Sequence, residues 1–294
     1  MSESIVIQGV SGPTPFLDQL TRLTCCTSHS RIENQPVFRF HGGSLSLALH
    51  EFCLEHQLDC ALVPDARQLA HFGLVAFDMD STLIDIETID ELAVIAGVSE
   101  QIIPLTERAM RGEIDFETSF RQRVALLKNL PVTALETVYQ QKLRLNPGAE
   151  CLIKELQRLG LKTVLITSGF EYFAERLKSR LGLDNVVCNR IGIYDGHFTG
   201  EISGKLIDAA GKASALDEYR IALGLRREQV IAIGDGANDL PMLGMAGMGI
   251  AYHAKALVRE QATCALNFVG LAGVLNLFEL PRKINVQSSP ERPS

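Results

Sequence analysis

The chain has 294 residues, 46% of them hydrophobic and 21% charged, which is enough for about two globular domains. Its 28 basic and 35 acidic residues give a net charge of −7, which excludes nucleic acid as an expected partner because phosphate backbones repel acidic surfaces. Without an apolar run of about 18 residues or a basic, apolar leader, we expect a cytoplasmic protein and no membrane partner. Seven cysteines without a Cys-x-x-Cys spacing indicate reduced thiols rather than disulfides or a zinc site.

Residues 1–70 predict a small α+β domain. Strand-like runs at 5–8, 36–40 and 59–64 alternate with helical stretches at 16–23 and 50–56. None of the histidines in this segment stands at metal-ligand spacing from carboxylates or cysteines. We therefore treat the segment as a separate module without an identified site.

Residues 71–280 predict an α/β domain. Short apolar runs at 73–77, 162–166 and 229–233 each end in a polar cluster, and they alternate with helical stretches at 151–159, 170–181 and 212–223. Such units form a Rossmann-like parallel sheet, and ligands bind outside the carboxyl ends of its strands. The polar clusters therefore mark the expected site.

An insertion at residues 89–146 predicts a helical cap. Its four helical stretches, at 89–96, 100–110, 116–127 and 134–143, lie between the first two apolar runs of the α/β pattern. Thr133 and Glu136 have the spacing of a capping box. A bundle placed there would cover the site, which leaves a core of residues 71–88 and 147–280. The polar segment 281–294 predicts a flexible tail.

Two acidic clusters carry the strongest chemical signal. Asp78 and Asp80 follow the first apolar run of the α/β pattern, and Asp235 and Asp239 follow the third. Carboxylates this close repel one another unless a cation or a proton lies between them. An oxygen-only site suits Mg²⁺ better than zinc or copper. The alternative, a solvated Asp-rich turn, explains one such cluster more readily than two in equivalent places.

Two weaker signals point to a bound phosphate. Lys212 begins a predicted helix, where the helix dipole disfavours a cation unless an anion is bound nearby. Thr167-Ser168-Gly169, between a strand and a helix, offers a hydroxyl and backbone N–H groups. A solvated lysine and an ordinary Ser-Gly turn remain the alternatives for these two signals taken singly.

Taken in order, these motifs resemble the haloacid dehalogenase-like hydrolase superfamily: Asp78-Met79-Asp80-Ser81-Thr82, then Ser168, Lys212, and Asp235 with Asp239. Residues 78–91 (DMDSTLIDIETIDE) and 110–124 (MRGEIDFETSFRQRV) resemble the phosphoserine phosphatase family in particular. The resemblance covers about residues 72–274. It implies a Mg²⁺-dependent phosphoric monoester hydrolase that converts O-phospho-L-serine to L-serine and phosphate, the last step of L-serine biosynthesis.

The resemblance also implies a role for each matching residue. Asp78 would be the nucleophile that forms an aspartyl-phosphate, and Asp80 the general acid and then the general base. Mg²⁺ would be held by Asp78, the backbone carbonyl of Asp80, and Asp235. The phosphoryl group would be bound by Ser168, Gly169, Lys212 and Asn238. Thr82 would orient the Asp80 side of the loop, and Asp239 would orient the metal shell or Lys212.

The cap residues that match the family would recognise an amino-acid substrate. Glu87 would face the ammonium group, and Arg123 would pair with the carboxylate through its planar guanidinium. Met110 and Phe116 would form an apolar wall. Taken without the resemblance, Glu87 also fits a helix start, Arg123 a helix surface, and the two apolar residues a core.

Alternatives to this function remain. A related capped phosphatase acting on phosphohomoserine, phosphothreonine or a sugar phosphate is the nearest, since one methyl group changes binding by only about 1 to 3 kcal/mol. A protein that only binds a phosphorylated ligand is disfavoured because both Asp78 and Asp80 are present. A nucleotide-dependent kinase or ATPase is also disfavoured. Its candidate phosphate-binding loop, Gly211-Lys212-Ala213, lacks the Ser or Thr that follows the lysine in such loops. Some family members have a regulatory amino-acid-binding domain where residues 1–70 stand, so a regulatory role stays open. The oligomeric state, a homodimer included, is a separate open question.

Overall fold

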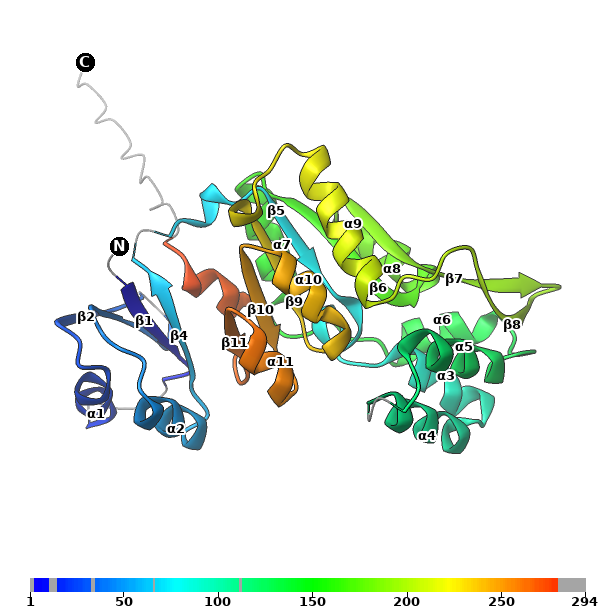
Figure 1. The fold of residues 1–294 in the computed structure, drawn as a ribbon, viewed down its shortest axis with the longest axis horizontal. Helices are drawn as coiled ribbons and strands as arrows, with labels where there is room; N and C mark the ends of the chain where they lie inside the picture. The colour runs from blue at the N-terminus through cyan, green and yellow to red at the C-terminus, as the bar shows by residue number, and fades with distance from the viewer. Residues whose placement is uncertain (1–2, 11–14, 33–34, 66, 111–112, 280–294) are drawn as a thin grey trace, which may run out of the picture.

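The computed structural model describes residues 3–10, 15–32, 35–65, 67–110 and 113–279, and it places an N-terminal domain, a central α/β domain and a helical cap side by side (Figure 1). The predicted tail, 281–294, lies outside the described residues. Within the described ranges, no helix has both the length and the apolar character needed to cross a bilayer.

The N-terminal domain is an antiparallel sheet with two helices on one face. Its strand order is β2-β3-β1-β4, and Ile5, Phe40 and Leu49 belong to the cluster between sheet and helices. The predicted α+β domain is thus confirmed. Strand β2 escapes prediction because its residues are polar and exposed. The elements are β1 (Glu3–Gln8), α1 (Pro15–Thr24), β2 (Ser28–Arg31), β3 (Val37–His41), α2 (Leu47–Glu55) and β4 (Asp59–Pro64).

The other face of this small sheet docks on the central domain. Gln8 Nε2 donates to the carbonyl of Gly273 at 3.0 Å. The buried Asp59 carboxylate accepts backbone N–H groups of residues 267, 268 and 269 at 2.6, 3.0 and 2.9 Å. Val6 belongs to the same apolar cluster as Leu271. The two domains therefore share a buried interface that both apolar contacts and hydrogen bonds cross.

The central sheet has seven strands in the order β11-β10-β9-β5-β6-β7-β8. The three predicted strands are its middle: β5 (Leu74–Phe77) pairs in parallel with β6 (Lys162–Phe170) and with β9 (Val230–Gly234). Only β8 runs antiparallel among the described pairings of this sheet. The remaining strands are β7 (Asn185–Tyr194), β8 (His197–Ser203), β10 (Met248–Tyr252) and β11 (Cys264–Leu266).

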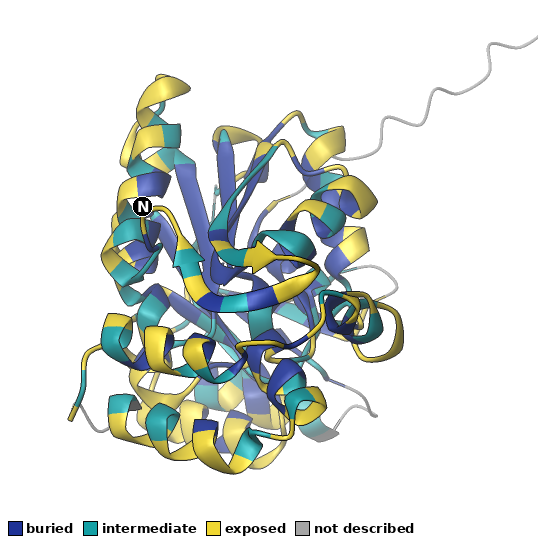
Figure 2. Ribbon diagram, turned by 90° about the vertical axis from the view of Figure 1, so that its right-hand side faces the viewer, coloured by how far each residue is buried: buried dark blue, intermediate teal, exposed yellow. Residues whose placement is uncertain are grey.

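Both faces of the middle of the central sheet are covered, so β5 and β9 are buried along their whole length (Figure 2). Side chains alternate along a strand: Phe77 packs in one cluster with residues of α7 and α8, and Ala76 in another with residues of α9 and α10. This two-sided burial explains why the strand sequences are apolar runs rather than alternating patterns. The helices are α7 (Ala149–Arg158), α8 (Glu171–Leu181), α9 (Ala209–Ala222), α10 (Leu240–Met245) and α11 (Ala256–Gln261).

The cap is a bundle of four helices, which end within two residues of their predicted bounds. They are α3 (Thr88–Ala96), α4 (Ser99–Met110), α5 (Phe116–Leu126) and α6 (Thr133–Gln141). The predicted capping box at Thr133 is wrong. Val132, with helical φ and ψ of −59° and −21°, already precedes α6 in a helical conformation, so Thr133 lies inside the helix and caps nothing. Glu136 instead accepts hydrogen bonds from Gln140 and Tyr172.

The two connections between cap and core are tied together beside the loop that follows β5. Ile84 and Leu145 form an antiparallel bridge. Asn146 Nδ2 donates to the carbonyls of Thr82 at 2.9 Å and Ile84 at 3.0 Å. The cap is therefore anchored within a few residues of Asp78.

Candidate active site

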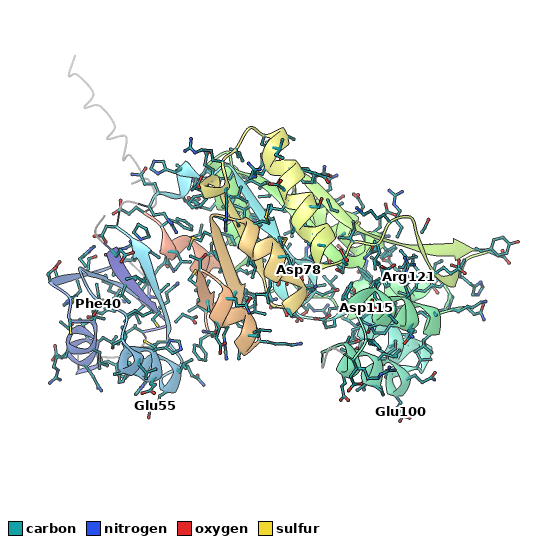
Figure 3. All side chains as sticks on the ribbon, in the orientation of Figure 1. Phe40, Glu55, Asp78, Glu100, Asp115 and Arg121 are labelled. Atoms are coloured by element: carbon teal, nitrogen blue, oxygen red, sulfur yellow. The ribbon has the colours of Figure 1, made fainter. Side chains whose placement is uncertain are left out.

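A cavity of about 530 Å³ lies between the carboxyl ends of the central strands and the cap. Figure 3 shows Asp78 between the core and the cap, with Glu100 at the outer edge of the cap. The predicted residues that line this cavity are Asp78, Asp80, Glu87, Phe116, Arg123, Ser168, Gly169, Lys212, Asp235 and Asn238. Thr82 and Asp239 are fully buried beneath it. Met110 ends α4, but its side chain lies outside the described part of the chain.

Asp78 is held at the end of the central strand and is paired with a buried lysine. Its N–H donates to the carbonyl of Ile233 on the neighbouring strand at 2.9 Å. Lys212 Nζ donates to Asp78 Oδ1 at 2.6 Å and to Asp239 Oδ1 at 2.8 Å, and Lys212 is 0% exposed. Burial lowers the pKa of Lys212, but the carboxylates of Asp239 and Asp78 outweigh it, and the pKa is raised. The lysine is therefore a permanent buried cation.

Helix α9 begins one turn earlier than predicted. Asp208 caps it by accepting the N–H of Gly211 at 2.7 Å, so Lys212 is the fourth helical residue. The sequence interpretation attributed the unfavourable position of this cation to a bound anion. In the structure, the carboxylates of Asp78 and Asp239 already supply negative charge to Lys212.

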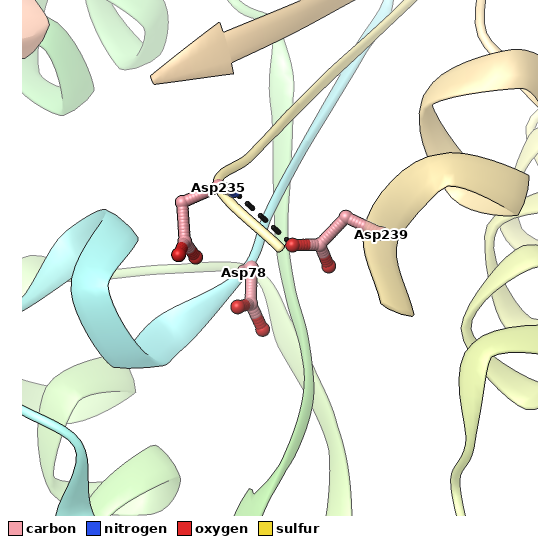
Figure 4. A group of neighbouring side chains, drawn as sticks. All are labelled: Asp78, Asp235 and Asp239. Atoms are coloured by element: carbon pink, nitrogen blue, oxygen red, sulfur yellow. Dashed lines mark hydrogen bonds between the residues drawn. The ribbon is translucent and has the colours of Figure 1, made fainter. Parts of the chain in front are cut away.

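Three carboxylates converge at the strand ends. Oxygens of Asp78, Asp235 and Asp239 lie within 4.8 Å of one another (Figure 4). Asp239 Oδ2 accepts the backbone N–H groups of Asp235 at 3.2 Å and Gly236 at 3.0 Å, which folds the second acidic motif around this side chain. A Cβ on Gly234 would lie 2.5 Å from Asp239 Cγ, so this approach requires glycine.

The acidic cluster carries more negative charge than Lys212 offsets. Burial, then the charge of Asp239, raises the pKa of Asp78 to about 7. Burial, then the charge of Asp78, raises the pKa of Asp235 to about 8. Carboxylate oxygens are the donors that Mg²⁺ prefers. The donor set therefore fits a hard divalent cation.

Asp80 is held by the first residue of the cap. Its Oδ2 accepts from Thr88 Oγ1 at 3.1 Å and its Oδ1 from the Thr88 N–H at 3.4 Å. Burial and the charges of Glu87 and Asp78 raise the pKa of Asp80 well above its usual range. A carboxyl that stays protonated near neutral pH can donate a proton.

The structure revises the residue that orients Asp80. We expected Thr82 to orient this side of the loop, but Thr82 Oγ1 donates to Asp235 Oδ1 at 3.2 Å. Thr88 holds Asp80 instead, and sequence reasoning missed it. Its signal was its place directly after Glu87, at the start of a predicted helix.

Ser168 and Gly169 line the cavity opposite Asp80. Ser168 Oγ is buried and has no hydrogen-bond partner among the described residues. The Gly169 N–H donates to Thr167 Oγ1 at 2.9 Å in this conformation. A Cβ on Gly169 would lie 2.4 Å from Met79 Cε and 3.1 Å from Asp80 Oδ2, so a side chain here would press on both of these side chains.

The cap side of the cavity presents the carboxyl groups of Glu87 and Asp90 and the guanidinium of Arg123. Glu87 accepts from Ser81 Oγ at 2.7 Å, and burial raises the pKa of Glu87. Arg123 lies on α5, its guanidinium 5.5 Å from the centre of the Phe120 ring. Its Nε is buried and lacks a hydrogen-bond partner within the described ranges. The structure adds residues that the sequence did not single out, Asp90, Phe120 and Lys255.

Comparisons with known proteins agree with this geometry. The model of the haloacid dehalogenase-like hydrolase family matches residues 75–244. A phosphoserine phosphatase of Polaromonas sp. is 48% identical over 221 residues, which cover 74% of this chain and 93% of that protein. The unliganded structure of a probable phosphoserine phosphatase from Vibrio cholerae has a TM-score of 0.81 and 34% identity, covering 93% of this chain and 85% of that chain.

A third relative is a solved structure with a modified aspartate. A structure of a phospho-aspartyl intermediate analogue of phosphoserine phosphatase has a TM-score of 0.67 and 37% identity, and it covers 71% of this chain and 99% of that chain. The family match extends over more than half of the chain, and the Polaromonas protein shares 48% sequence identity over 74% of it. The chain belongs to the haloacid dehalogenase-like hydrolase family.

Proposed function

We propose that the protein is a phosphoserine phosphatase, which hydrolyses O-phospho-L-serine to L-serine and phosphate. The observation that carries this proposal is the pairing of two unlike sets of groups across one cavity. The core side offers the nucleophile candidate Asp78 with its buried cation Lys212, and the cap side offers Glu87 and Arg123. A phosphorylated amino acid has complementary groups at both ends.

In the first step, an Asp78 oxygen attacks the phosphorus atom and the bond from phosphorus to the serine oxygen breaks. Asp80 gives its proton to the departing serine oxygen. The raised pKa of Asp80 supports this role, since the acid must still hold its proton when the substrate binds. Lys212 holds Asp78 in place and offsets the charge of the phosphoryl oxygens.

In the second step, the Asp80 carboxylate accepts a proton from a water molecule that attacks the phosphorus of the aspartyl-phosphate. The bond between phosphorus and the Asp78 oxygen breaks, phosphate leaves, and both aspartates return to their initial states. Ser168, Gly169 and Asn238 line the space that the phosphoryl oxygens would occupy in both steps.

We assign a Mg²⁺ site to the side chains of Asp78 and Asp235 and the backbone carbonyl of Asp80. The cation, when bound, would neutralise charge on the phosphoryl oxygens. Asp239 lies in the same carboxylate cluster but is committed to Lys212 and to two backbone N–H groups. Its role is to keep Lys212 and the second acidic motif in position.

Substrate choice would follow from the cap. Arg123 can form two parallel hydrogen bonds with the substrate carboxylate, and Glu87 can accept from its ammonium group. We propose that residues 89–146 move to admit the substrate. The partner is accordingly a small molecule, and the negative net charge and free cysteines support a cytoplasmic enzyme without a nucleic-acid partner.

The proposal is tested by phosphate release from L-phosphoserine, D-phosphoserine, phosphothreonine, phosphohomoserine and glucose 6-phosphate, with and without Mg²⁺. We expect a strong preference for L-phosphoserine that is lost on chelation. Equal rates on all five substrates would retain the aspartate chemistry but contradict the amino-acid specificity. Absence of any release would contradict the enzyme function.

A further inference from the structure

One buried amide joins the two segments that carry Ser168 and Lys212. Asn189 lies on β7 and is 1% exposed. Its Nδ2 donates to the carbonyl of Ser168 at 2.8 Å and to that of Ile207 at 3.3 Å. Its Oδ1 accepts the N–H of Ile207 at 2.8 Å. Both ends of the amide are therefore bonded to backbone from other parts of the chain.

The Ser168 contact lies where strand β6 leaves the regular ladder. Ile166 pairs with Val187, but the next recorded pair on these strands is Phe170 with Asn189, so four steps along β6 span two along β7. A bulge of this kind leaves backbone groups without their usual strand partners. At this bulge, the Asn189 side chain takes the place of a strand partner and donates a hydrogen bond to the Ser168 carbonyl.

The Ile207 contact lies directly before helix α9. Ile207 precedes Asp208, whose side chain caps the helix and whose carbonyl accepts the N–H of Lys212 at 2.8 Å. The position of Ile207 thus sets where the helix begins. Lys212 follows one turn later and reaches Asp78.

We propose that Asn189 is a positioning residue that holds Ser168 and the start of α9 in register, so that the Ser168 hydroxyl and the Lys212 amine meet the same phosphoryl group. The inference rests on the proposed function of that site. Displacement of a binding group by about 1 Å costs about a hundredfold in rate. The hydrogen bonds of Asn189 to Ser168 and Ile207 therefore affect the rate of phosphoryl transfer.

Asn189→Asp tests the tie with little change in size. An ionised carboxylate can still accept the N–H of Ile207, but it cannot donate to the carbonyls of Ser168 and Ile207. The matched control is Asn185→Asp, the same change on the same strand, where the Asn185 amide oxygen accepts the N–H of Val186. We expect kcat/KM for phosphoserine to fall about ten- to a hundredfold in Asn189→Asp and by less than about twofold in the control.

Inhibition by the two products, orthophosphate and L-serine, distinguishes a misplaced phosphate-binding group from damage to the whole active site. Asn189→Asp should weaken inhibition by orthophosphate about tenfold and leave inhibition by L-serine unchanged, because the serine groups face the cap. The neutral variant Asn189→Ser should show the same selective loss, and it decides the question if the aspartate variant does not fold.

Unchanged orthophosphate inhibition in a folded Asn189 variant would overturn the inference. So would an equal weakening of both products, which indicates damage to the whole site. Failure of the wild-type enzyme to hydrolyse phosphoserine would instead contradict the proposed function. Calorimetric binding of orthophosphate to wild-type protein and the variants would then still test the role of Asn189.

Discussion

Lys212 Nζ and Asp78 Oδ1 lie 2.6 Å apart, and the two residues are 0% and 5% exposed. A buried ion pair is costly to form, and removing one partner leaves the other uncompensated. The lysine also bonds both Asp78 and Asp239, and its charge offsets part of the repulsion between these two carboxylates. Lys212 therefore stabilises the fold of the site as well as the charge that chemistry brings to it.

Lys212→Met should accordingly lower the stability of the protein as well as the rate of phosphate release. Loss of the cation leaves Asp78 and Asp239 buried without a counter-charge, and we expect the free energy of unfolding to fall by about 3 kcal/mol at neutral pH. Denaturant unfolding followed by fluorescence or circular dichroism measures this. The loss should shrink at acidic pH, where the aspartates bind protons, and a pH-independent loss would contradict the explanation.

Asp78→Asn should abolish turnover while the protein stays folded. The amide keeps the size of the side chain but cannot form the acyl phosphate. A phosphate-release assay with phosphoserine measures activity, and a thermal unfolding midpoint measures folding. Turnover near the wild-type rate would exclude Asp78 as the nucleophile.

Arg123→Ala should discriminate between substrates. Truncating one partner of a charged hydrogen-bonded pair costs about 2 kcal/mol or more, so kcat/KM for phosphoserine should fall at least about thirtyfold. An aryl phosphate, which lacks the carboxylate, should lose far less. Arg121→Ala is the control, because Arg121 is on the same helix but is exposed and paired with Glu117. Equal losses on both substrates would make Arg123 a structural residue.

The pKa values of the acidic cluster predict how Mg²⁺ stabilisation depends on pH. The pKa of Asp78, about 7, and that of Asp235, about 8, exceed those of an unfolded chain. The metal-free folded state thus binds more protons, and its stability falls as pH rises from about 4 to about 8. Mg²⁺ needs ionised carboxylates, so it binds more tightly as pH rises. The difference between the thermal unfolding midpoints with Mg²⁺ and with a chelator should therefore grow as pH rises over this range. A constant difference would contradict the assignment of the Mg²⁺ site to Asp78 and Asp235.

Gly169→Ala should disturb the site through contact alone. The added methyl would meet Met79 Cε at 2.4 Å and Asp80 Oδ2 at 3.1 Å, so the Met79 side chain must shift and the Asp80 carboxyl is displaced. We expect kcat to fall about a hundredfold. Gly244→Ala is the matched control: nothing lies within 4 Å of its added methyl, and it stands in helix α10, where alanine is favoured. Wild-type kcat in Gly169→Ala would show that the loops are not tightly fitted.

Sequence patterns predicted the middle strands β5, β6 and β9 and the cap helices, but not β10, although it is buried along its whole length. The central strands are buried on both faces and read as apolar runs, and the cap helices have regular apolar spacing. The β7–β8 hairpin escaped prediction because most of β7 is only half-buried and its side chains follow no simple alternation. Helix α9 was placed a turn late because its first turn is Ala209-Ala210-Gly211, which carries little pattern.

The site residues were accessible to sequence reasoning where they belong to compact motifs. Asp78, Asp80, Asp235 and Lys212 meet at one edge because parallel strands end there. Positioning residues such as Thr88 and Asn189 carry no such signature. An amide or hydroxyl that bonds distant backbone becomes visible only once the chain has folded.

The β7–β8 hairpin described above extends from the core onto the cap (Figure 1). The N–H of Phe198 donates to the carbonyl of Leu130, the N–H of Asn129 donates to the carbonyl of Phe198, and both are at 2.9 Å. A cap that swings about Ile84 and Leu145 must either break these backbone bonds or carry the tip of the hairpin with it. If the bonds are kept, the tip of the hairpin moves with the cap, and a motion of the cap would be transmitted to β7, the strand that carries Asn189.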